Sequence, residues 1–181
     1  MQTLNHRTTE RRIDYNQTSP GGVEALRSMD RYAKESGLNP TLLELVKIRA
    51  SQINHCAFCI DMHTKDARDH GESEQRLYGL SAWRETPFYT DQERAALTWT
   101  EAITLIDREQ ASDDVYEQVR CFFGEKDLAD LTFAILAINC WNRLAIGFRT
   151  PAGSYHSDHP VTKGRTGVRP SAAEGGGGSD Y

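Results

Sequence analysis

Apolar residues recur at helical spacing along most of the stretch from residue 19 to 150, and no β-branched alternation runs through five or more residues. Val23, Leu26, Met29 and Ala33 are three or four positions apart, which places them on one face of a helix. Because the pattern is helical nearly throughout, the sequence predicts an all-α domain of six or seven helices.

Polar signals mark where these helices begin and end. Asn39 is expected to cap a helix whose first position is Pro40, and Thr90 opens a capping box. Ser112 is expected to cap a later helix, and Gly71 to end an earlier one. The expected helices begin near Val23, Pro40, Cys56, Ser73, Asp91, Asp113 and Glu125.

Length and composition fit one globular domain with a polar segment at each end. The chain has 181 residues, of which 38% are hydrophobic. Residues 1–18 are expected to form a polar N-terminal arm and residues 19–150 the helical domain. Residues 151–181 hold seven of the fourteen Gly and three of the six Pro, so we expect a flexible tail.

The charge balance and the apolar segments bear on partners and location. With 21 Lys and Arg against 26 Asp and Glu, the net charge is −5, which disfavours binding to a phosphate backbone. The apolar run from Leu131 to Phe148 is interrupted by Asn139, Asn142 and Arg143, so we expect a buried core helix rather than a bilayer span. No secretory signal or lipidation motif is visible. We therefore expect a cytoplasmic protein that binds neither nucleic acid nor membranes.

Two of the four cysteines, Cys56 and Cys59, form a Cys-x-x-Cys motif. On a helix these two residues share one stripe with His63, at intervals of three and four. Cys56 lies near the expected helix start, where free backbone N–H groups stabilise a thiolate. His63 is one turn beyond Cys59, and Glu44 on the preceding helix can orient its ring.

This set supplies a nucleophile, a base, an orienting acid and a resolving thiol. A thiolate can attack the distal oxygen of a hydroperoxide and become a sulfenic acid. The neighbouring thiol then condenses with it to a disulfide, and an external dithiol reduces that disulfide. The sequence therefore predicts a thiol-dependent peroxidase with a hydroperoxide substrate and a dithiol reductant.

Zinc binding and redox sensing are the alternatives. Cys56, Cys59 and His63 would supply three zinc ligands, but His70 is too far along the same helix to complete a compact tetrahedral site. We therefore predict neither metal ligands nor a bound cofactor. A non-catalytic redox-sensing or assembly role for the same disulfide stays open.

The remaining polar and sulfur side chains of the long apolar segments are expected to be structural. Cys121 is interpreted as a small packing residue, and Cys140 as an inert core residue. Asn139 and Asn142 need hydrogen-bond partners within an apolar helix, so we expect helix–helix or subunit contacts. The three Trp are expected to anchor the core or a subunit interface, and the exposed apolar surface predicts a homo-oligomer.

The motif and its surroundings resemble a known family. Glu44, Cys56, Cys59 and His63 follow one another at intervals of twelve, three and four, within the stretch that runs from Leu43 through Gly71. The chain is similar here to the AhpD-like alkylhydroperoxidases of the carboxymuconolactone decarboxylase superfamily. Together with the segments around Trp83 and Asn139, the similarity covers about residues 12–150.

The resemblance implies an all-α fold that assembles into homotrimers or homohexamers. It implies reduction of alkyl hydroperoxides and a dithiol partner, such as a lipoylated or thioredoxin-like protein. By this analogy Cys59 is the peroxidatic cysteine, Cys56 the more exposed resolving cysteine, and Glu44 and His63 the proton relay. Decarboxylases of the superfamily generally do not need the cysteine pair, which makes that activity the less favoured one.

One departure concerns the residues between the two cysteines. The best-known AhpD proteins carry a His there that takes part in the relay, whereas this chain has Ala57 and Phe58. His55, immediately before the motif, is a candidate to replace that imidazole. A shorter relay would affect the rate and the preferred reductant rather than the thiol chemistry itself.

Overall fold

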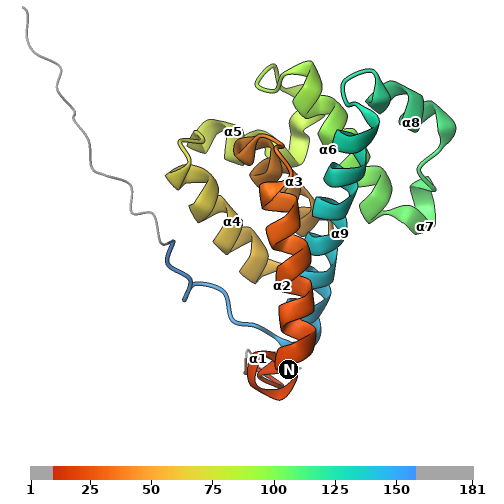
Figure 1. Cartoon of the computed structure of the whole chain (residues 1–181). Coiled ribbons are helices and arrows are strands. Elements are labelled where there is room, and N and C mark those ends of the chain that lie inside the picture. The colour runs from red at the N-terminus through yellow and green to blue at the C-terminus, as the bar shows by residue number, and fades with distance from the viewer. Residues whose placement is uncertain (1–9, 158–181) are drawn as a thin grey trace, which may run out of the picture.

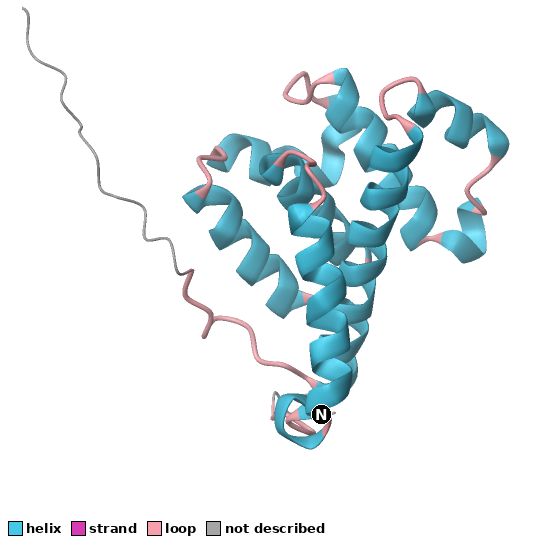
Figure 2. Ribbon diagram, in the orientation of Figure 1, coloured by secondary structure: helices cyan, strands magenta, loops and turns pink. Residues whose placement is uncertain are grey.

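The structure is a computed structural model that describes residues 10–157. In this range all regular secondary structure is helical (Figure 2). The nine α-helices and one 3₁₀ helix of these residues are α1 (Tyr15–Thr18), α2 (Pro20–Glu35), α3 (Pro40–Ile53), α4 (Ala57–Asp69), α5 (Glu74–Gly79), η1 (Leu80–Glu85), α6 (Asp91–Thr104), α7 (Ile106–Glu109), α8 (Asp113–Arg120) and α9 (Glu125–Phe148). The predicted all-α class is confirmed, and the seven longer α-helices match the expected segments.

The sequence patterns missed the three remaining helical segments, α1, η1 and α7. The helices α1 and α7 are single turns of four residues, too short for an apolar periodicity to be visible. In η1 the backbone leaves helical geometry at Ala82, so its residues do not follow the 3.6-residue period.

Helix α3 lies at the centre of the fold and packs against α4, α6 and α9. All seven residues from 42 to 48 are buried, so both sides of this helix are covered over two turns. Its start is fixed as predicted, because the Asn39 side chain accepts hydrogen bonds from the N–H groups of Thr41 and Leu42. The capping box of Thr90 and Glu93 at the start of α6 is also confirmed.

Helix α9 is the long apolar helix expected from the sequence, and it packs against α2, α3 and α6 (Figure 1). By length and composition alone it could also cross a membrane, and 44% of its most apolar window is buried inside the fold. Asn139 and Asn142 are buried, and both accept from the Asn54 amide at 2.9 Å. The two Asn therefore form the helix–helix contacts that the sequence predicted.

Three expectations about individual residues are wrong. Ser112 precedes α8, but its side chain makes no capping hydrogen bond. Cys121 and Cys140 are exposed rather than packed in the core. Cys140 lies on the outer face of α9 with Phe133 and Leu136. The sequence could not show this, because apolar residues occur all around this helix and do not reveal which face is covered.

The chain segments before α2 and after α9 meet beside the helical core. The backbone N–H of Arg12 donates to the carbonyl of Phe148 at 3.0 Å, and the Tyr15 hydroxyl lies 3.4 Å from Thr150 Oγ1. Residues 151–157 then run past α4 (Figure 1), and Tyr155 donates its hydroxyl to Asp66 at 2.7 Å. The other parts of the expected arm and tail, residues 1–9 and 158–181, lie outside the described residues.

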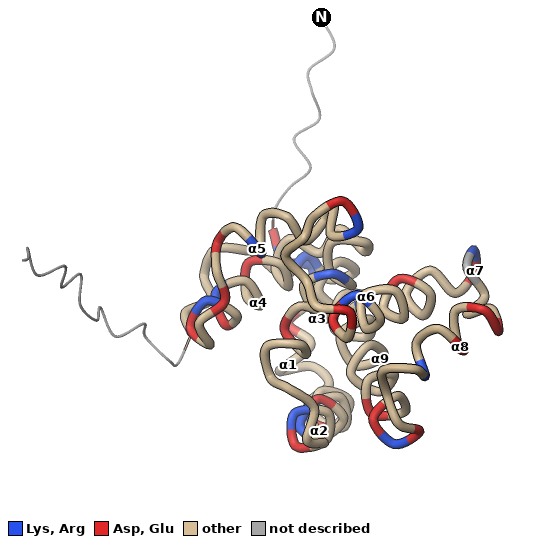
Figure 3. Tube along the Cα trace, turned by 90° about the horizontal axis from the view of Figure 1, so that it is seen from above, with Lys and Arg blue, Asp and Glu red and all other residues tan. Residues whose placement is uncertain are grey.

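Acidic and basic positions alternate over the outer turns of the helices rather than forming a surface of one sign (Figure 3). Helix α9 carries its charges near its start and at Arg143, and its middle is free of them. This distribution leaves the apolar inner faces of α3 and α9 to form the core against which the cysteine motif packs.

Candidate active site

Cys56 and Cys59 form a disulfide at the start of α4, with their Cα atoms 5.4 Å apart. Cys56 is the N-cap residue of this helix, and its sulfur accepts a hydrogen bond from the Cys59 N–H at 3.4 Å. The preceding residue, His55, has a left-handed φ of 59°, which turns the chain from α3 into α4. The spacing of three residues and the helix start together bring the two sulfur atoms into bonding contact.

Both cysteines are buried, each with 1% of its surface exposed. They pack against Ala50 of α3 and against Ile138 and Ala145 of α9. The expectation that Cys56 is the more exposed cysteine is therefore wrong for the disulfide form. The two differ instead in what they face, because Cys59 lines a cavity and Cys56 does not.

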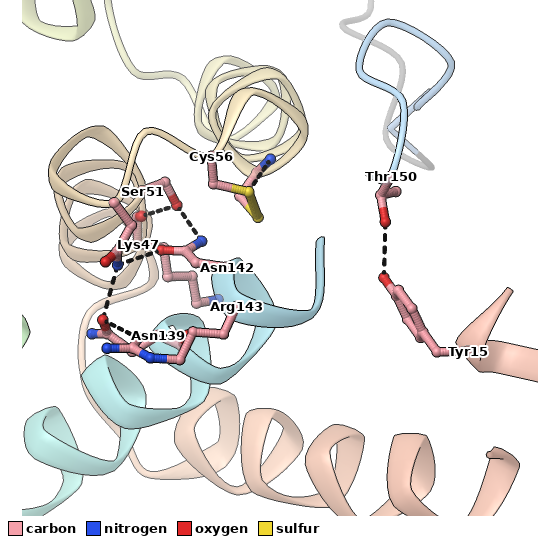
Figure 4. The surroundings of a disulfide bond; sticks show 10 residues. Tyr15, Lys47, Ser51, Cys56, Asn139, Asn142, Arg143 and Thr150 are labelled. Atoms are coloured by element: carbon pink, nitrogen blue, oxygen red, sulfur yellow. Dashed lines mark hydrogen bonds between the residues drawn. A yellow bond between two sulfur atoms is a disulfide. The ribbon is translucent and has the colours of Figure 1, made fainter. Parts of the chain in front are cut away.

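Polar side chains fix the backbone beneath the disulfide (Figure 4). The N–H of Cys56 donates to the Ser51 carbonyl at 2.9 Å, and the Ser51 hydroxyl donates to the Lys47 carbonyl at 2.7 Å. Asn142 of α9 donates its amide to the Ser51 hydroxyl at 3.0 Å. Helices α3 and α9 thus hold the turn that carries Cys56.

His63 lies one turn after Cys59 on the same helix and is buried. Its Nδ1 is 2.8 Å from Oε2 of Glu44 on α3. Because the two helices pack side by side, the carboxylate fixes the ring of His63 from across the helix pair. The structure thus brings together all four residues that the sequence singled out, Glu44, Cys56, Cys59 and His63.

Glu44 has a second partner that the sequence analysis missed. Lys47, one turn along α3, has 2% of its surface exposed and donates to Glu44 Oε1 at 3.1 Å. Burial alone raises the pKa of Glu44, but the hydrogen bond and charge of His63, with those of Lys47, lower this pKa to about 2. Glu44 is therefore a carboxylate at neutral pH and can accept a hydrogen bond from the N–H of Nδ1, which leaves Nε2 as the ring nitrogen that can act as a base.

A cavity of about 400 Å³ opens beside Cys59, His63 and Glu44. Its apolar lining comes from α4 and α9, and its charged lining mainly from α2. Tyr15 and Tyr155, from the two segments that flank the helical core, also contribute. The remaining lining residues are Asn16, Arg27, Asp30, Lys34, Phe58, Met62, Asp66, Trp141 and Ala145. A small organic molecule with an apolar body can therefore lie against the sulfur of Cys59.

Sequence reasoning could not place the walls of this cavity, since they come from segments far apart in the chain. A usable signal existed for Lys47, a charged residue inside the apolar run from Leu42 to Ile48. His55 is exposed and does not line the cavity, so the structure does not place it where a replacement for the missing imidazole would be needed.

Three donor groups close to the sulfur atoms have the spacing of a cation site. The ligand atoms of Glu44, His63 and Asp66 lie within 4.8 Å of one another. A cation there would compete with the Lys47 ammonium for Glu44, and with the Tyr155 hydroxyl for Asp66. The contacts therefore fit a hydrogen-bonded relay better than a metal centre.

Comparison with known proteins identifies relatives along most of the described chain. The model of the carboxymuconolactone decarboxylase family matches residues 20–102. The uncharacterized protein YdfG of Bacillus subtilis is 47% identical over 143 residues, which cover 79% of this chain and 97% of YdfG. YnjA of Escherichia coli is 29% identical over 119 residues, covering 66% of this chain and 65% of YnjA.

Solved structures give the same result. A protein of unknown function from Agrobacterium tumefaciens, provisionally called the antioxidant defence protein AhpD, superposes with a TM-score of 0.78 at 44% identity. The match covers 81% of this chain and 100% of that protein. The debrominase Bmp8, at a TM-score of 0.69 and 14% identity over 76% of this chain and 74% of its own, shares the fold. The family model names the family, and the Agrobacterium protein is matched over its whole length, so this chain belongs to the carboxymuconolactone decarboxylase family, as an AhpD-like member.

Proposed function

We propose that the protein is a thiol-dependent peroxidase that reduces alkyl hydroperoxides through a dithiol–disulfide cycle of Cys56 and Cys59. One observation carries this proposal: the Cys56–Cys59 disulfide shares a buried site with His63, which is held by Glu44 at 2.8 Å. The AhpD-like family and the apolar cavity beside Cys59 support it further. In this proposal Cys59 is the peroxidatic cysteine, because it is the one that faces the cavity.

The first step oxidises Cys59. Nε2 of His63 takes the thiol proton, while the Glu44 carboxylate stabilises the imidazolium through Nδ1. The Cys59 thiolate attacks the distal oxygen of the hydroperoxide, and the O–O bond breaks. The departing alkoxide recovers the proton from Nε2 and leaves as an alcohol, so Cys59 becomes a sulfenic acid and the peroxide is reduced by two electrons.

The second step closes the disulfide, and the third reopens it. The Cys56 sulfur attacks the sulfenic sulfur of Cys59, an S–S bond forms, and the hydroxyl group leaves with the thiol proton as water. A dithiol reductant then exchanges with the disulfide through a mixed disulfide, which returns two thiols and oxidises the reductant. A lipoylated or thioredoxin-like protein has the chemistry that this step needs.

We also propose that the protein acts as a homotrimer or homohexamer in the cytoplasm. Large apolar side chains on the outer face of α9, at Phe133, Leu136 and Ile146, are between 42% and 46% exposed. Such a face favours burial against a second subunit. Light scattering is expected to give a multiple of the 20.4 kDa chain mass, and a clean monomer would contradict this part of the proposal.

Anaerobic mass spectrometry after one equivalent of cumene hydroperoxide tests the proposed cycle. Wild type is expected to lose two hydrogen atoms as the disulfide forms. The Cys56→Ser variant should gain one oxygen at Cys59, whereas Cys59→Ser should stay unoxidised at Cys56, and Cys140→Ser serves as the matched control. Full peroxide turnover in both Cys56→Ser and Cys59→Ser would refute the proposal.

Two further assays separate the two alternatives. If peroxide oxidised the protein stoichiometrically but no dithiol supported turnover, redox sensing would be favoured over catalysis. Activity on a muconolactone that survives alkylation of both thiols would favour a decarboxylase instead.

A further inference from the structure

Helix α3 carries a buried cation next to the relay. The Nζ atom of Lys47 lies 3.1 Å from Glu44 Oε1, on the opposite side of the carboxylate from His63. Its ammonium group also lies 3.8 Å from Oδ1 of Asp30 on α2. Burying a lysine costs free energy unless its charge is paired, and here the carboxylates of Glu44 and Asp30 both pair with the ammonium group.

We propose that Lys47 is a positioning residue of the relay: its ammonium group holds one oxygen of Glu44, so that the other oxygen keeps His63 aimed at Cys59. This inference rests on the proposed peroxidase function and assigns to that site a residue outside the Glu–Cys–Cys–His motif. With Lys47 donating to one oxygen of Glu44 and Nδ1 of His63 to the other, the plane of the carboxylate is fixed, and with it the imidazole ring.

Lys47 also gives the site a charge that matters for its chemistry. A carboxylate shared between an ammonium group and an imidazole is a weaker base than one that faces the imidazole alone. Glu44 therefore stays ionised and leaves the proton on Nδ1 of His63. In a chain that has Phe58 where the best-known relatives have an imidazole, this arrangement completes the relay with a cation from α3.

The other titratable and charged groups around the relay come mainly from α2 and α4. Helix α4 contributes Asp66, which accepts a hydrogen bond from the Tyr155 hydroxyl, and its C-cap residue His70 lines a second cavity together with Glu44 and Lys47. Helix α9 contributes only the neutral Trp141 and Ala145 to the cavity beside Cys59. Helix α2 contributes Asp30, Lys34 and Arg27. Of these three, Asp30 contacts Lys47 and also pairs with Lys34 at 3.5 Å. Lys47 is thus the cation that the structure places against Glu44.

The test compares Lys47→Met with Asp30→Asn. Lys47→Met removes the charge and keeps the length of the side chain, so the pKa of Glu44 is expected to rise from about 2, since burial is then opposed by His63 alone. Asp30→Asn leaves the contact between Lys47 and Glu44 in place, so the pKa of Glu44 should stay low. A lysine needed only for packing would leave the Glu44 pKa unchanged in Lys47→Met.

Two measurements are made on each variant. The first follows the Glu44 carboxyl carbon by NMR between pH 3 and 8 in the oxidised protein without peroxide. The second is the rate of disulfide formation with cumene hydroperoxide. For Lys47→Met we expect the acid-side fall of this rate to begin at a higher pH than in wild type, in step with the raised Glu44 pKa, since each pH unit below a pKa lowers the ionised fraction about tenfold.

Lys126→Met is the matched control, because Lys126 also pairs with a buried carboxylate, that of Asp130, outside the site. It should change neither the Glu44 titration nor the pH dependence of the rate. An unchanged Glu44 titration in Lys47→Met would overturn the inference. Because the titration needs no peroxide, a shifted Glu44 pKa without peroxide reduction would support the role of Lys47 and refute only the proposed function.

If Lys47→Met does not fold, Lys47→Gln takes its place, because it also removes the ammonium charge. The same rise of the Glu44 pKa is expected in that variant, and an unchanged Glu44 titration would contradict the assigned role.

Discussion

Two buried carboxylates, Glu44 on α3 and Asp130 on α9, have almost the same partners and very different surroundings. Glu44 accepts a hydrogen bond from Lys47 and is also hydrogen-bonded to the imidazole ring of His63. Asp130 accepts from Lys126 at 2.5 Å and from the Tyr32 hydroxyl at 2.7 Å. In both cases a lysine and an aromatic side chain hold the acid in its ionised form.

The difference lies in what the partners can do. Lys126 is 71% exposed and Tyr32 is 50% exposed, so the network of Asp130 opens to water and joins α2 to α9. The partners of Glu44 are buried, and the imidazole of His63 leads on to a redox-active sulfur. Lys126 and Tyr32 lower the pKa of Asp130, as the partners of Glu44 lower its pKa. A lowered pKa therefore indicates only that a carboxylate is paired. A cavity and a reactive neighbouring side chain are needed as well to indicate an active site.

Removing the charge of each acid gives the largest expected difference between these two regions. Glu44→Gln is expected to slow disulfide formation with cumene hydroperoxide about 100-fold, because the relay loses the group that orients and stabilises the His63 imidazolium. Asp130→Asn should leave this rate unchanged. Stopped-flow measurement of the reduced proteins checks both, and equal slowing in the two variants would end the distinction.

The second prediction concerns how the free energy of unfolding depends on pH through the charge of Glu44. The pKa of Glu44 is lowered to about 2 by folding, so its contribution to stability is complete above about pH 4.5 and is lost as the pH falls towards 2. The shift corresponds to something on the order of 3 kcal/mol. Urea unfolding at pH 6 and pH 3 should show wild type losing more free energy of unfolding than Glu44→Gln loses. An equal loss in both proteins would contradict the assigned charge state.

The four motif residues could be predicted because their arrangement is local. Cys56, Cys59 and His63 lie within eight residues on one helix, and Glu44 lies on the helix before it. The helix period and one helix–helix contact are enough to bring them together. The family resemblance added the roles of the two cysteines and also suggested, wrongly for the disulfide form, that Cys56 is the more exposed.

The cavity walls could not be predicted, because they depend on packing between distant segments. Tyr15 and Thr150 meet across 135 positions of the chain, and Tyr155 reaches Asp66 across 89. Their sequences show polar or Gly-containing segments without periodicity, which favoured an arm and a tail rather than a wall. Residues 151–157 instead follow α4, and hydrogen bonds such as those of this segment to Asp61, Lys65 and Asp66 leave no sequence pattern.

The contribution of this wall is testable as a smaller effect on substrate binding. Tyr155→Ala is expected to raise the KM for cumene hydroperoxide about 5-fold, because the apolar ring area beside the cavity is lost, with a smaller effect on hydrogen peroxide. Tyr155→Phe should keep most of the binding, since it removes only the hydroxyl that donates to Asp66. Tyr78→Ala, at a residue that is 76% exposed, is the control. Equal KM changes for both peroxides would contradict a role in holding the organic group.

The smallest expected effect concerns the other two cysteines, Cys121 and Cys140. Comparing them with Cys56 and Cys59 tests whether a cysteine must be buried beside the relay to take part in peroxide reduction. Cys121 and Cys140 are exposed, whereas Cys56 and Cys59 are joined and buried. In the oxidised protein iodoacetamide should therefore add no adduct to Cys56 or Cys59, as read by intact mass and peptide mapping. It should label Cys121, and it should label Cys140 as far as a second subunit leaves the outer face of α9 uncovered. Cys140→Ser should change peroxide turnover by less than about twofold, as expected for a surface substitution. A larger loss would mean that the outer face of α9 takes part in the cycle, since no base or buried carboxylate of the described residues contacts Cys140 in the subunit.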